Sequence, residues 1–305
     1  MKAAVIGVGH LGRHHARILS SLPGISLAGV VDTNLERAAQ IAGEFGTRSF
    51  RDVSEIGALD LAVIAAPTES HAAIAMPLVE AGIHVLVEKP VTQTLAEADA
   101  LIAAAKRKGV VLAVGHSERF NPAVAAARPY VSDPRFIEVH RLGTQIGRSL
   151  DIDVVLDLMI HDLDLILSIV PSEVESVEAV GVPVLTNKVD IANARVRFRN
   201  GCIANLTASR ISKDQVRKIR FFQRERYVSI DTAAKEVEIF QLVPQADGLP
   251  KIGGGKQAVQ GEEPLKAELE DFVAAVRDGR APAVPGEQGR AALALAVRIV
   301  ELMRQ

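Results

Sequence analysis

A few polar side chains interrupt an otherwise apolar stretch at residues 154–167. Asp157, His161 and Asp164 are spaced i, i+4 and i+7, so an α-helix would place them in one stripe. Because such a helix is apolar nearly all round, it should be buried, and its polar groups need partners. A histidine held by carboxylates is the arrangement of an oriented general base, although a structural network would satisfy the same groups. No further His or Cys cluster completes a metal shell, so we expect no metal.

Lys89 is the second candidate for chemistry. It lies in the tripeptide Glu88-Lys89-Pro90, directly after the apolar run His84–Val87. If that run is a parallel strand, Lys89 emerges at the carboxyl edge, where open α/β sheets bind ligands. Taken by itself, this position fits a solvated loop lysine better than a catalytic one.

A glycine loop near the N-terminus has the G-x-G-x-x-G spacing of a dinucleotide site. It follows a strand-like run and precedes a helical pattern, which is the context that the motif requires. The first glycine permits a tight turn, the second lets the backbone approach a pyrophosphate, and the third allows close packing of helix on strand. The predicted loop consists of Gly7, Val8, Gly9, His10, Leu11 and Gly12.

Asp32 supplies the second part of this motif. It lies 20 residues after Gly12, at the end of the second strand-like run, where a carboxylate accepts hydrogen bonds from the adenosine ribose. The same charge repels a 2′-phosphate, which favours NAD over NADP. Arg37, one turn into the next predicted helix, would attract that phosphate, so NADP stays open.

The elements that position these residues alternate between strands and helices up to about residue 120. This rhythm predicts a doubly wound parallel sheet, an α/β Rossmann domain over residues 1–120 that binds NAD(P). The expected strands are 3–6, 27–31, 61–65, 84–87 and 110–114, and the expected helices are 10–20, 35–45, 70–81 and 95–108.

Residues 121–305 have a different pattern, in which one apolar helix precedes many strand-like runs. We expect an α+β domain for substrate binding and oligomerisation, with a large, mainly antiparallel sheet that is open on one face. An open apolar face predicts a homodimer or homotetramer. Residues 244–263, rich in Gly, Pro and Gln, predict a loop. The strand-like runs are 136–142, 174–180, 192–199, 202–208, 218–222, 227–230 and 237–242, and helices are expected at 265–278 and 286–303.

The composition narrows the possible partners. The 305 residues include 35 Lys and Arg against 37 Asp and Glu, so no basic excess is available for nucleic acid. The one cysteine, Cys202, lies in an apolar strand-like run and predicts a buried, inert thiol without a disulfide. The N-terminus turns into the glycine loop too soon for a signal peptide, and no apolar run reaches spanning length. We expect a cytoplasmic protein without a membrane partner.

In combination, these motifs resemble the glucose-fructose oxidoreductase, inositol dehydrogenase and MocA (Gfo/Idh/MocA) family over essentially the whole chain. The resemblance implies a Rossmann domain joined to an open-faced sheet, with Lys89, Asp157 and His161 around the reacting carbon. It also implies a cis peptide before Pro90, which a tertiary amide makes less costly. One departure is Asp153-Val154-Val155, where the family commonly has a glycine pair. The other matching residues, several of them expected at the cofactor, are Ala66, Pro67, Thr68, His71, Glu88, Pro90, the segment Gly115-His116 and the pair Asn121-Pro122.

The resemblance implies an NAD-dependent oxidation of a secondary hydroxyl in a sugar or sugar derivative. His161 would take the hydroxyl proton, Lys89 would polarise the oxygen and Asp157 would orient His161. Lys89 could instead accept the proton, and the sequence leaves both assignments open. An inositol, polyol or free-sugar dehydrogenase, an NAD-dependent glycosidase and a cofactor-binding regulator without turnover are the alternatives.

A UDP-N-acetylhexosamine oxidised at C3 is the specific substrate that we expect. The helix at residues 155–164 looks similar to that of family members making 3-keto sugar nucleotides. A basic cluster also suits a diphosphate, although a solvated basic strand edge explains it slightly better. The cluster comprises Arg210, Lys213, Arg217, Lys218 and Arg220, and the individual residues expected at the substrate are Asn121, Arg148, Asp164 and Arg210.

Overall fold

The computed structural model describes residues 1–144, 150, 152–245 and 249–304. The chain forms two compact units. The first comprises Met1–Ser117 and Leu265–Arg290, and the second comprises Glu118–Pro264 and the residues from Ala291 to the C-terminus. None of the described helices combines the length and apolarity needed to span a bilayer.

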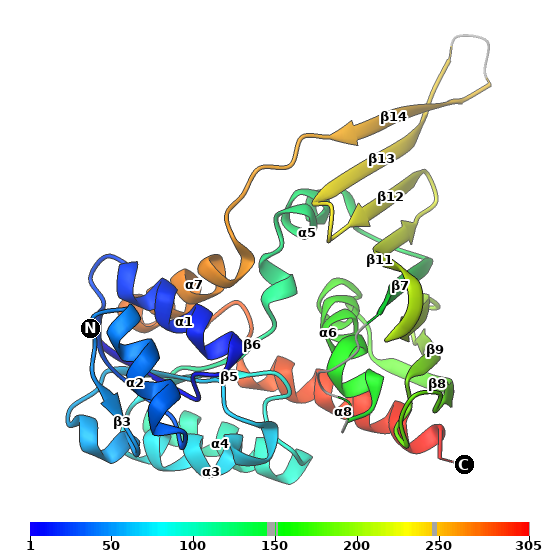
Figure 1. The fold of residues 1–305 in the computed structure, drawn as a ribbon. Coiled ribbons are helices and arrows are strands. Elements are labelled where there is room, and N and C mark those ends of the chain that lie inside the picture. The colour runs from blue at the N-terminus through cyan, green and yellow to red at the C-terminus, as the bar shows by residue number, and fades with distance from the viewer. Residues whose placement is uncertain (145–149, 151, 246–248, 305) are drawn as a thin grey trace. The chain divides into compact units, whose positions relative to one another are not determined.

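A six-stranded parallel sheet forms the centre of the first unit, in the order β3-β2-β1-β4-β5-β6 (Figure 1). This is the doubly wound order in which ligands bind at the carboxyl edge, beside the reversal between the first and fourth strands. The Rossmann prediction is therefore confirmed, with one short strand that the pattern did not indicate, β3. The strands are β1 (Lys2–Ile6), β2 (Ser26–Val31), β3 (Ser49–Phe50), β4 (Leu61–Ile64), β5 (His84–Glu88) and β6 (Leu112–Gly115).

Helices cover both faces of this sheet. Apolar residues of α1, α2 and α7 share one core with alternate strand residues, and those of α3 and α4 share the core on the other face. Helix α7 joins this unit because Leu269 and Phe272 pack against the same core as Val5 of β1, so a single cut near residue 120 does not separate the two units. The helices are α1 (His10–Ser21), α2 (Leu35–Glu44), α3 (Thr68–Glu80), α4 (Leu95–Lys108) and α7 (Pro264–Asp278), with a 3₁₀ turn at Val53–Ile56.

An eight-stranded sheet forms the second unit, in the order β14-β13-β12-β11-β7-β10-β9-β8. Within this sheet, the pair β10 and β7 is parallel and the other pairs of described strands are antiparallel, so the mainly antiparallel prediction is confirmed. The strands are β7 (Phe136–Thr144), β8 (Val174–Val182), β9 (Ile191–Phe198), β10 (Ile203–Ser209), β11 (Ile211–Phe222), β12 (Arg226–Asp231), β13 (Glu236–Val243) and β14 (Lys251–Gln257).

The core of the second unit lies on one face of this sheet. Apolar residues of α6 (Ile160–Ile169) and of the later part of α8 (Gly286–Leu302) pack there against inward-facing strand residues. A short helix, α5 (Pro122–Ala127), contributes Ala123 and Val124 to the same core. Cys202 is 1% exposed in this core, which confirms the buried thiol.

Strand β14 corrects the loop expected at residues 244–263. Three consecutive glycines of this strand pair with β13, so the composition that indicated a loop belongs to a strand. Gly254 has φ +131°, and a Cβ atom there would lie 2.0 Å from the carbonyl oxygen of Ile239. Glycine is needed because the two backbones approach closely at this point.

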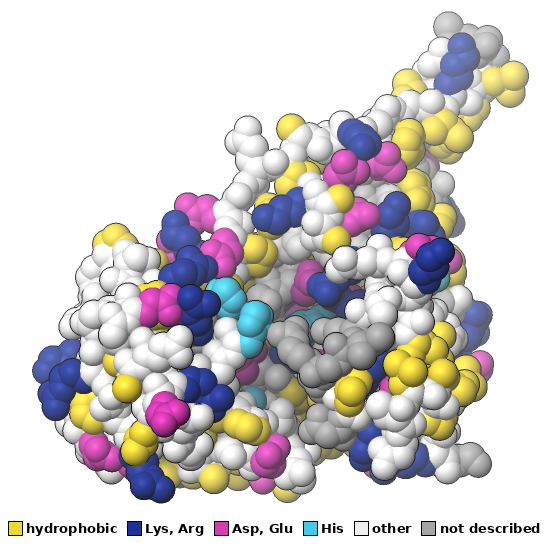
Figure 2. All heavy atoms as spheres, in the orientation of Figure 1, with side chains coloured by type: hydrophobic (Ala, Val, Ile, Leu, Met, Phe, Trp, Pro, Cys, Tyr) yellow, Lys and Arg dark blue, Asp and Glu magenta, His cyan; other side chains and the backbone are white. Residues whose placement is uncertain are grey.

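Charged side chains of both signs are interspersed over the visible face of the molecule (Figure 2). Basic residues do not merge there into one continuous surface.

Candidate active site

The glycine loop between β1 and α1 has the form that a bound pyrophosphate requires. Gly7 has φ +83°, and a Cβ atom on Gly12 would lie 1.8 Å from the carbonyl oxygen of Gly7, so neither position accepts a side chain. At Gly9 an added Cβ atom would meet nothing within 4 Å, which leaves room for a ligand beside the backbone. Gly9 is also the N-cap of α1 and makes no side-chain cap, so the helix N-terminus is open to an anion.

Asp32 lies at the carboxyl end of β2 and is nearly buried. Its carboxylate accepts the backbone N–H of Val8 at 2.9 Å and that of Asn34 at 2.9 Å. Arg37 donates to it through Nε at 3.0 Å and through a terminal nitrogen at 2.8 Å. Burial alone would raise the pKa of Asp32, but the hydrogen bonds from Arg37, Asn34 and Val8 lower it below its usual value. Asp32 is therefore a charged acceptor at neutral pH.

A pocket of about 780 Å³ connects these residues within the first unit. Its size suits a large part of a dinucleotide. The sequence motif does not indicate part of its lining, because Arg51, Val53 and Ser54 come from the segment after β3. The predicted cofactor residues that line it are Gly7, Gly9, Asp32, Arg37, Ala66 and Pro67.

His71 links two of the predicted cofactor segments. It is buried in α3, with Nε2 at 2.8 Å from the carbonyl oxygen of Ala66 and Nδ1 at 2.9 Å from that of Pro90. The loop after β4 is thereby tied to the turn after β5. Among the other predicted cofactor residues, Thr68 opens α3, while His10 and Leu11 are exposed in the first turn of α1.

Lys89 follows β5 as predicted, is half-buried, and precedes Pro90 through a cis peptide bond, which confirms that expectation. Glu88 holds this turn. Its Oε2 accepts the Lys89 N–H at 3.2 Å, and its Oε1 lies 2.7 Å from Nε2 of His15. Gly115 makes room for the carboxylate, because a Cβ atom there would lie 2.8 Å from it.

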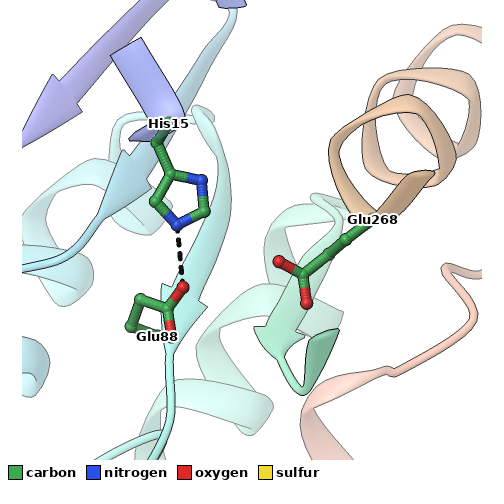
Figure 3. A group of neighbouring side chains, drawn as sticks. All are labelled: His15, Glu88 and Glu268. Atoms are coloured by element: carbon green, nitrogen blue, oxygen red, sulfur yellow. Dashed lines mark hydrogen bonds and ion pairs between the residues drawn. The ribbon is translucent and has the colours of Figure 1, made fainter. Parts of the chain in front are cut away.

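Glu88 was expected at the cofactor, but its pairing with His15 was not predicted. His15 is fully buried on α1, and Glu268 of α7 completes a group whose potential ligand atoms lie within 4.8 Å of one another (Figure 3). One imidazole and two carboxylates are donors that a metal ion accepts, but the hydrogen bond between His15 and Glu88 accounts for their contact without one. The helical pattern indicates that His15 is buried, because it shares a face with Gly12, Ala16 and Leu19, but it does not indicate the partner of His15.

In the second unit, the polar stripe on the apolar helix differs from a regular α-helical one. Val155–Met159 form a π-helical segment that runs into α6. Asp157 lies in this segment and His161 in α6, so the i, i+4 relation of a continuous α-helix does not hold for them. Single π turns are frequent at functional sites. Asp157 is 9% exposed and His161 is half-buried.

Two ion pairs with buried carboxylates hold α6 just after His161. Asp164 accepts from Nε of Arg119 at 2.5 Å and from a terminal nitrogen at 2.9 Å, which supplies the partner that its burial requires. Asp162 makes a second bidentate pair with Arg141 of β7, at 2.8 Å for both contacts.

Arg141 also donates to Glu118 at 3.1 Å. Burial alone would lower the pKa of Arg141, but Asp162 and Glu118 outweigh it and raise the pKa, so this guanidinium stays charged. The sequence did not indicate the Arg141 pairs, because they join residues far apart in the chain.

Three of the predicted substrate residues have partners within the second unit. Asp164 pairs with Arg119, as described, and Asn121 caps α5 while its amide donates to the Thr232 carbonyl at 3.0 Å. Arg210 is 0% exposed and donates to the Ile152 carbonyl at 2.7 Å, with Nε at 3.8 Å from Asp190. Arg148 lies outside the described residues.

Comparison with known proteins agrees with this geometry. Residues 1–116 match an oxidoreductase family with an NAD-binding Rossmann fold, and residues 143–226 match the Gfo/Idh/MocA C-terminal domain. A UDP-N-acetylglucosamine 3-dehydrogenase from Acidithiobacillus ferrooxidans is 41% identical over 302 residues, 98% of this chain and 96% of that protein. The chain belongs to the Gfo/Idh/MocA family.

Other relatives of this Gfo/Idh/MocA oxidoreductase are also dehydrogenases. The scyllo-inositol 2-dehydrogenase of Bacillus subtilis is 31% identical over 70% of this chain and 68% of its own length. A solved structure of the Acidithiobacillus enzyme has a TM-score of 0.94 at 40% identity, covering 99% of this chain and 97% of that one. A levoglucosan dehydrogenase solved with NADH shares the fold, with a TM-score of 0.89 at 22% identity over 100% of this chain and 97% of that one. The protein is thus an NAD-binding dehydrogenase that acts on CH–OH groups.

Proposed function

We propose that this dehydrogenase oxidises the C3 hydroxyl of a UDP-N-acetylhexosamine, with UDP-N-acetylglucosamine as the first candidate. The sequence identity to the Acidithiobacillus enzyme, 41% over nearly the full length of both chains, carries this proposal. Inositol dehydrogenases that match nearly the whole chain are only 25–26% identical to it.

The proposed chemistry divides between the two units. NAD, when bound along the glycine loop and Asp32, supplies the hydride acceptor. His161 accepts the proton of the reacting hydroxyl, and Asp157 orients His161 and the substrate. Lys89, at the carboxyl end of β5, stabilises the negative charge that develops on the oxygen. The exchanged assignment, with Lys89 as proton acceptor, predicts the same loss of turnover when either residue is replaced.

The ion pairs around α6 support the role of His161. A general base must be held within hydrogen-bond reach of the proton that it takes. Asp162 directly follows His161 and is anchored to β7, while Asp164 is anchored to Arg119. Backbone movement of this turn would break buried charge pairs, which is costly. The helix therefore holds the backbone of His161 in a fixed position.

Substrate panels test the proposal directly. UDP-N-acetylglucosamine, UDP-N-acetylgalactosamine, myo-inositol and glucose are each incubated with NAD, and NADH is followed by absorbance. Because a 3-keto product is often uphill in free energy, the assay includes a coupled aminotransferase or measures exchange of labelled hydride. Turnover of inositol or glucose, with none of either UDP-sugar, would contradict the nucleotide-sugar assignment and leave the dehydrogenase class intact.

We also propose that the protein is a homo-oligomer that pairs through the second sheet. Rings on β7, β11, β12 and β13 form a cross-strand row, with successive centroids 5.4, 5.1 and 6.2 Å apart. They alternate with core residues such as Phe221 and Val228, so the row lies on the face opposite the core. The row consists of Phe136, Phe222, Tyr227 and Phe240.

A partly exposed aromatic row of this kind, in which Phe222 is the most exposed member, favours association with a second copy. Light scattering at micromolar concentration tests this, and a monomer there would contradict it. Because UDP-sugars and NAD are cytoplasmic metabolites, we place the reaction in the cytoplasm.

A further inference from the structure

A second pocket, of about 330 Å³, lies entirely within the second unit. Three of its lining side chains are cationic: Arg141 on β7, and Lys213 and Arg217 on β11. Leu158 also lines it, and this residue belongs to the π-helical segment that contains Asp157. The pocket therefore adjoins the helix that carries the proposed general base.

The sheet places these cations together by an irregular register. Ile211 of β11 pairs with Thr144 of β7, but Val216 pairs with Leu142, so residues 212–215 are a bulge opposite Gly143. Bulges change the direction of side chains and are common beside active sites. Lys213 and Gln215, which both line the pocket, come from this bulge.

Arg217 and Arg141 lie directly opposite each other on the two strands. Like charges in that position destabilise a sheet. Burial lowers the pKa of Arg217, and the charge of Arg141 lowers it further, which reflects the same unfavourable proximity. Such a pair is expected where an anion is to be bound between or beside the two charges.

The charges around the pocket leave a positive excess. Arg141 is matched by Asp162, with which it is bidentate. Glu118 contacts Arg141 at 3.1 Å and lies 3.8 Å from Arg217, so one carboxylate is shared by two guanidinium groups. Lys213 is exposed, and no carboxylate among the described residues pairs with it.

We propose that this pocket binds the diphosphate of a nucleotide-linked sugar, with Arg217 and Lys213 as the phosphate-contacting residues. Arg217 offers the planar donors that suit phosphate oxygens, and Lys213 adds a point charge. Arg141 adds positive electrostatic potential to the pocket, but its guanidinium donates to Asp162 and Glu118 rather than to the ligand. This inference rests on the proposed function and adds to it: the pocket is the reason that a nucleotide sugar, rather than a neutral polyol, would be held beside His161.

The basic cluster expected from the sequence does not act as one group, because only some of its members line this pocket. Arg210 is fully buried, and Arg220 donates to Glu138 at 2.6 Å. Lys218 alternates with Arg217 along β11 and lies 4.0 Å from Asp231. Lys213 and Arg217 are the two members of the cluster that line the pocket.

The test compares Arg217→Gln and Lys213→Ala with Lys218→Ala, a matched loss of one positive charge on the same strand. Each of the first two variants should raise KM for the UDP-sugar and Kd for UDP by about 10- to 100-fold, while kcat and the Kd for NAD change by less than about threefold. Lys218→Ala should leave all four values near wild type. Raising the salt concentration should weaken UDP binding by the wild type more than by Arg217→Gln. If Arg217→Gln unfolds, Arg217→Lys retains the charge and is measured in its place.

The outcomes separate this inference from the proposed function. Turnover of UDP-N-acetylglucosamine by the wild type, with unchanged KM in both pocket variants, overturns the pocket and leaves the function standing. If the wild type oxidises only inositol or glucose, the function fails, and calorimetric titration with UDP still decides the pocket. UDP binding that the pocket variants weaken supports it in that case. Absent UDP binding, or equal binding by all variants, overturns it.

Discussion

Replacing Asp32 with alanine should change both the strength and the selectivity of cofactor binding. The carboxylate that would accept the ribose hydroxyls is lost, and a hydrogen bond to a charged group contributes about 1.5–3 kcal/mol. We therefore expect the Kd for NAD to rise by about 10- to 100-fold. The Val8 N–H also loses its acceptor, 2.9 Å away, so part of this effect comes from a less ordered glycine loop.

Selectivity should shift because Arg37 is released. In the native protein both its Nε and a terminal nitrogen donate to Asp32. Without that carboxylate, the guanidinium can make a bidentate pair with a 2′-phosphate, and the repelling charge is gone. The ratio of NAD to NADP affinity should fall by about 100-fold or more, combining the loss for NAD with a gain for NADP. The double variant Asp32→Ala/Arg37→Ala should bind NAD as weakly as Asp32→Ala does. It should not show the increased affinity for NADP.

Titration of both cofactors, followed by nicotinamide fluorescence, measures these changes. Glu44→Gln is the matched control, because Glu44 is an exposed carboxylate that pairs with Arg13 and has no contact with Asp32. Since the pKa of Asp32 is lowered in the folded protein, its contribution is present above the ordinary aspartate value and is lost only as pH falls through the lowered pKa. An unchanged NAD to NADP ratio in Asp32→Ala would refute this account of the site.

Other substitutions test the remaining parts of the site. Lys89→Met and His161→Ala should each lower kcat by about 100-fold or more, with the Kd for NAD within a few fold, and near-normal turnover would remove that residue from the mechanism. Asp162→Ala leaves Arg141 buried without its bidentate partner and should lower the free energy of unfolding by about 3–5 kcal/mol in urea denaturation, whereas a loss below about 1 kcal/mol would mark the pair as dispensable. Burial raises the pKa of Cys202 to about 11, so a disulfide reagent at neutral pH should modify the native thiol far more slowly than the denatured one. Equal rates would contradict its burial.

The first unit was largely predictable because its signals are local. Apolar strands of a parallel sheet, buried on both faces, appear as continuous runs, and the glycine loop and Asp32 have fixed places relative to those strands. What the sequence did not indicate depends on distant contacts. Helix α7 packs into the first unit because of Leu269 and Phe272, and the residues that precede it in the chain give no sign of that. The hydrogen bond between His15 and Glu88 likewise requires that α1 and β5 are already side by side.

The second unit was predictable in type but not in detail. Alternating apolar and polar residues indicate strands, but three glycines hid β14, whose formation depends on its partner β13. The π-helical segment at Val155–Met159 has no pattern that distinguishes it from an α-helix over so few residues. The spacing argument selected Asp164 and passed over Asp162, although both are buried and each has an arginine partner. Identifying those partners requires the tertiary structure.

Arg141 connects the two proposed functions of the second unit. Through Asp162 it fixes the turn of α6 that carries His161, and its own side chain lines the proposed diphosphate pocket. The pocket and the general base are thus attached to the same buried ion pair rather than to separately mobile loops. A rigid connection of this kind keeps the distance between the bound diphosphate and the general base constant. This suits a substrate whose reacting carbon, C3, belongs to the same sugar ring that carries the diphosphate. A small neutral polyol would gain nothing from that spacing, because it has no group for the pocket to hold.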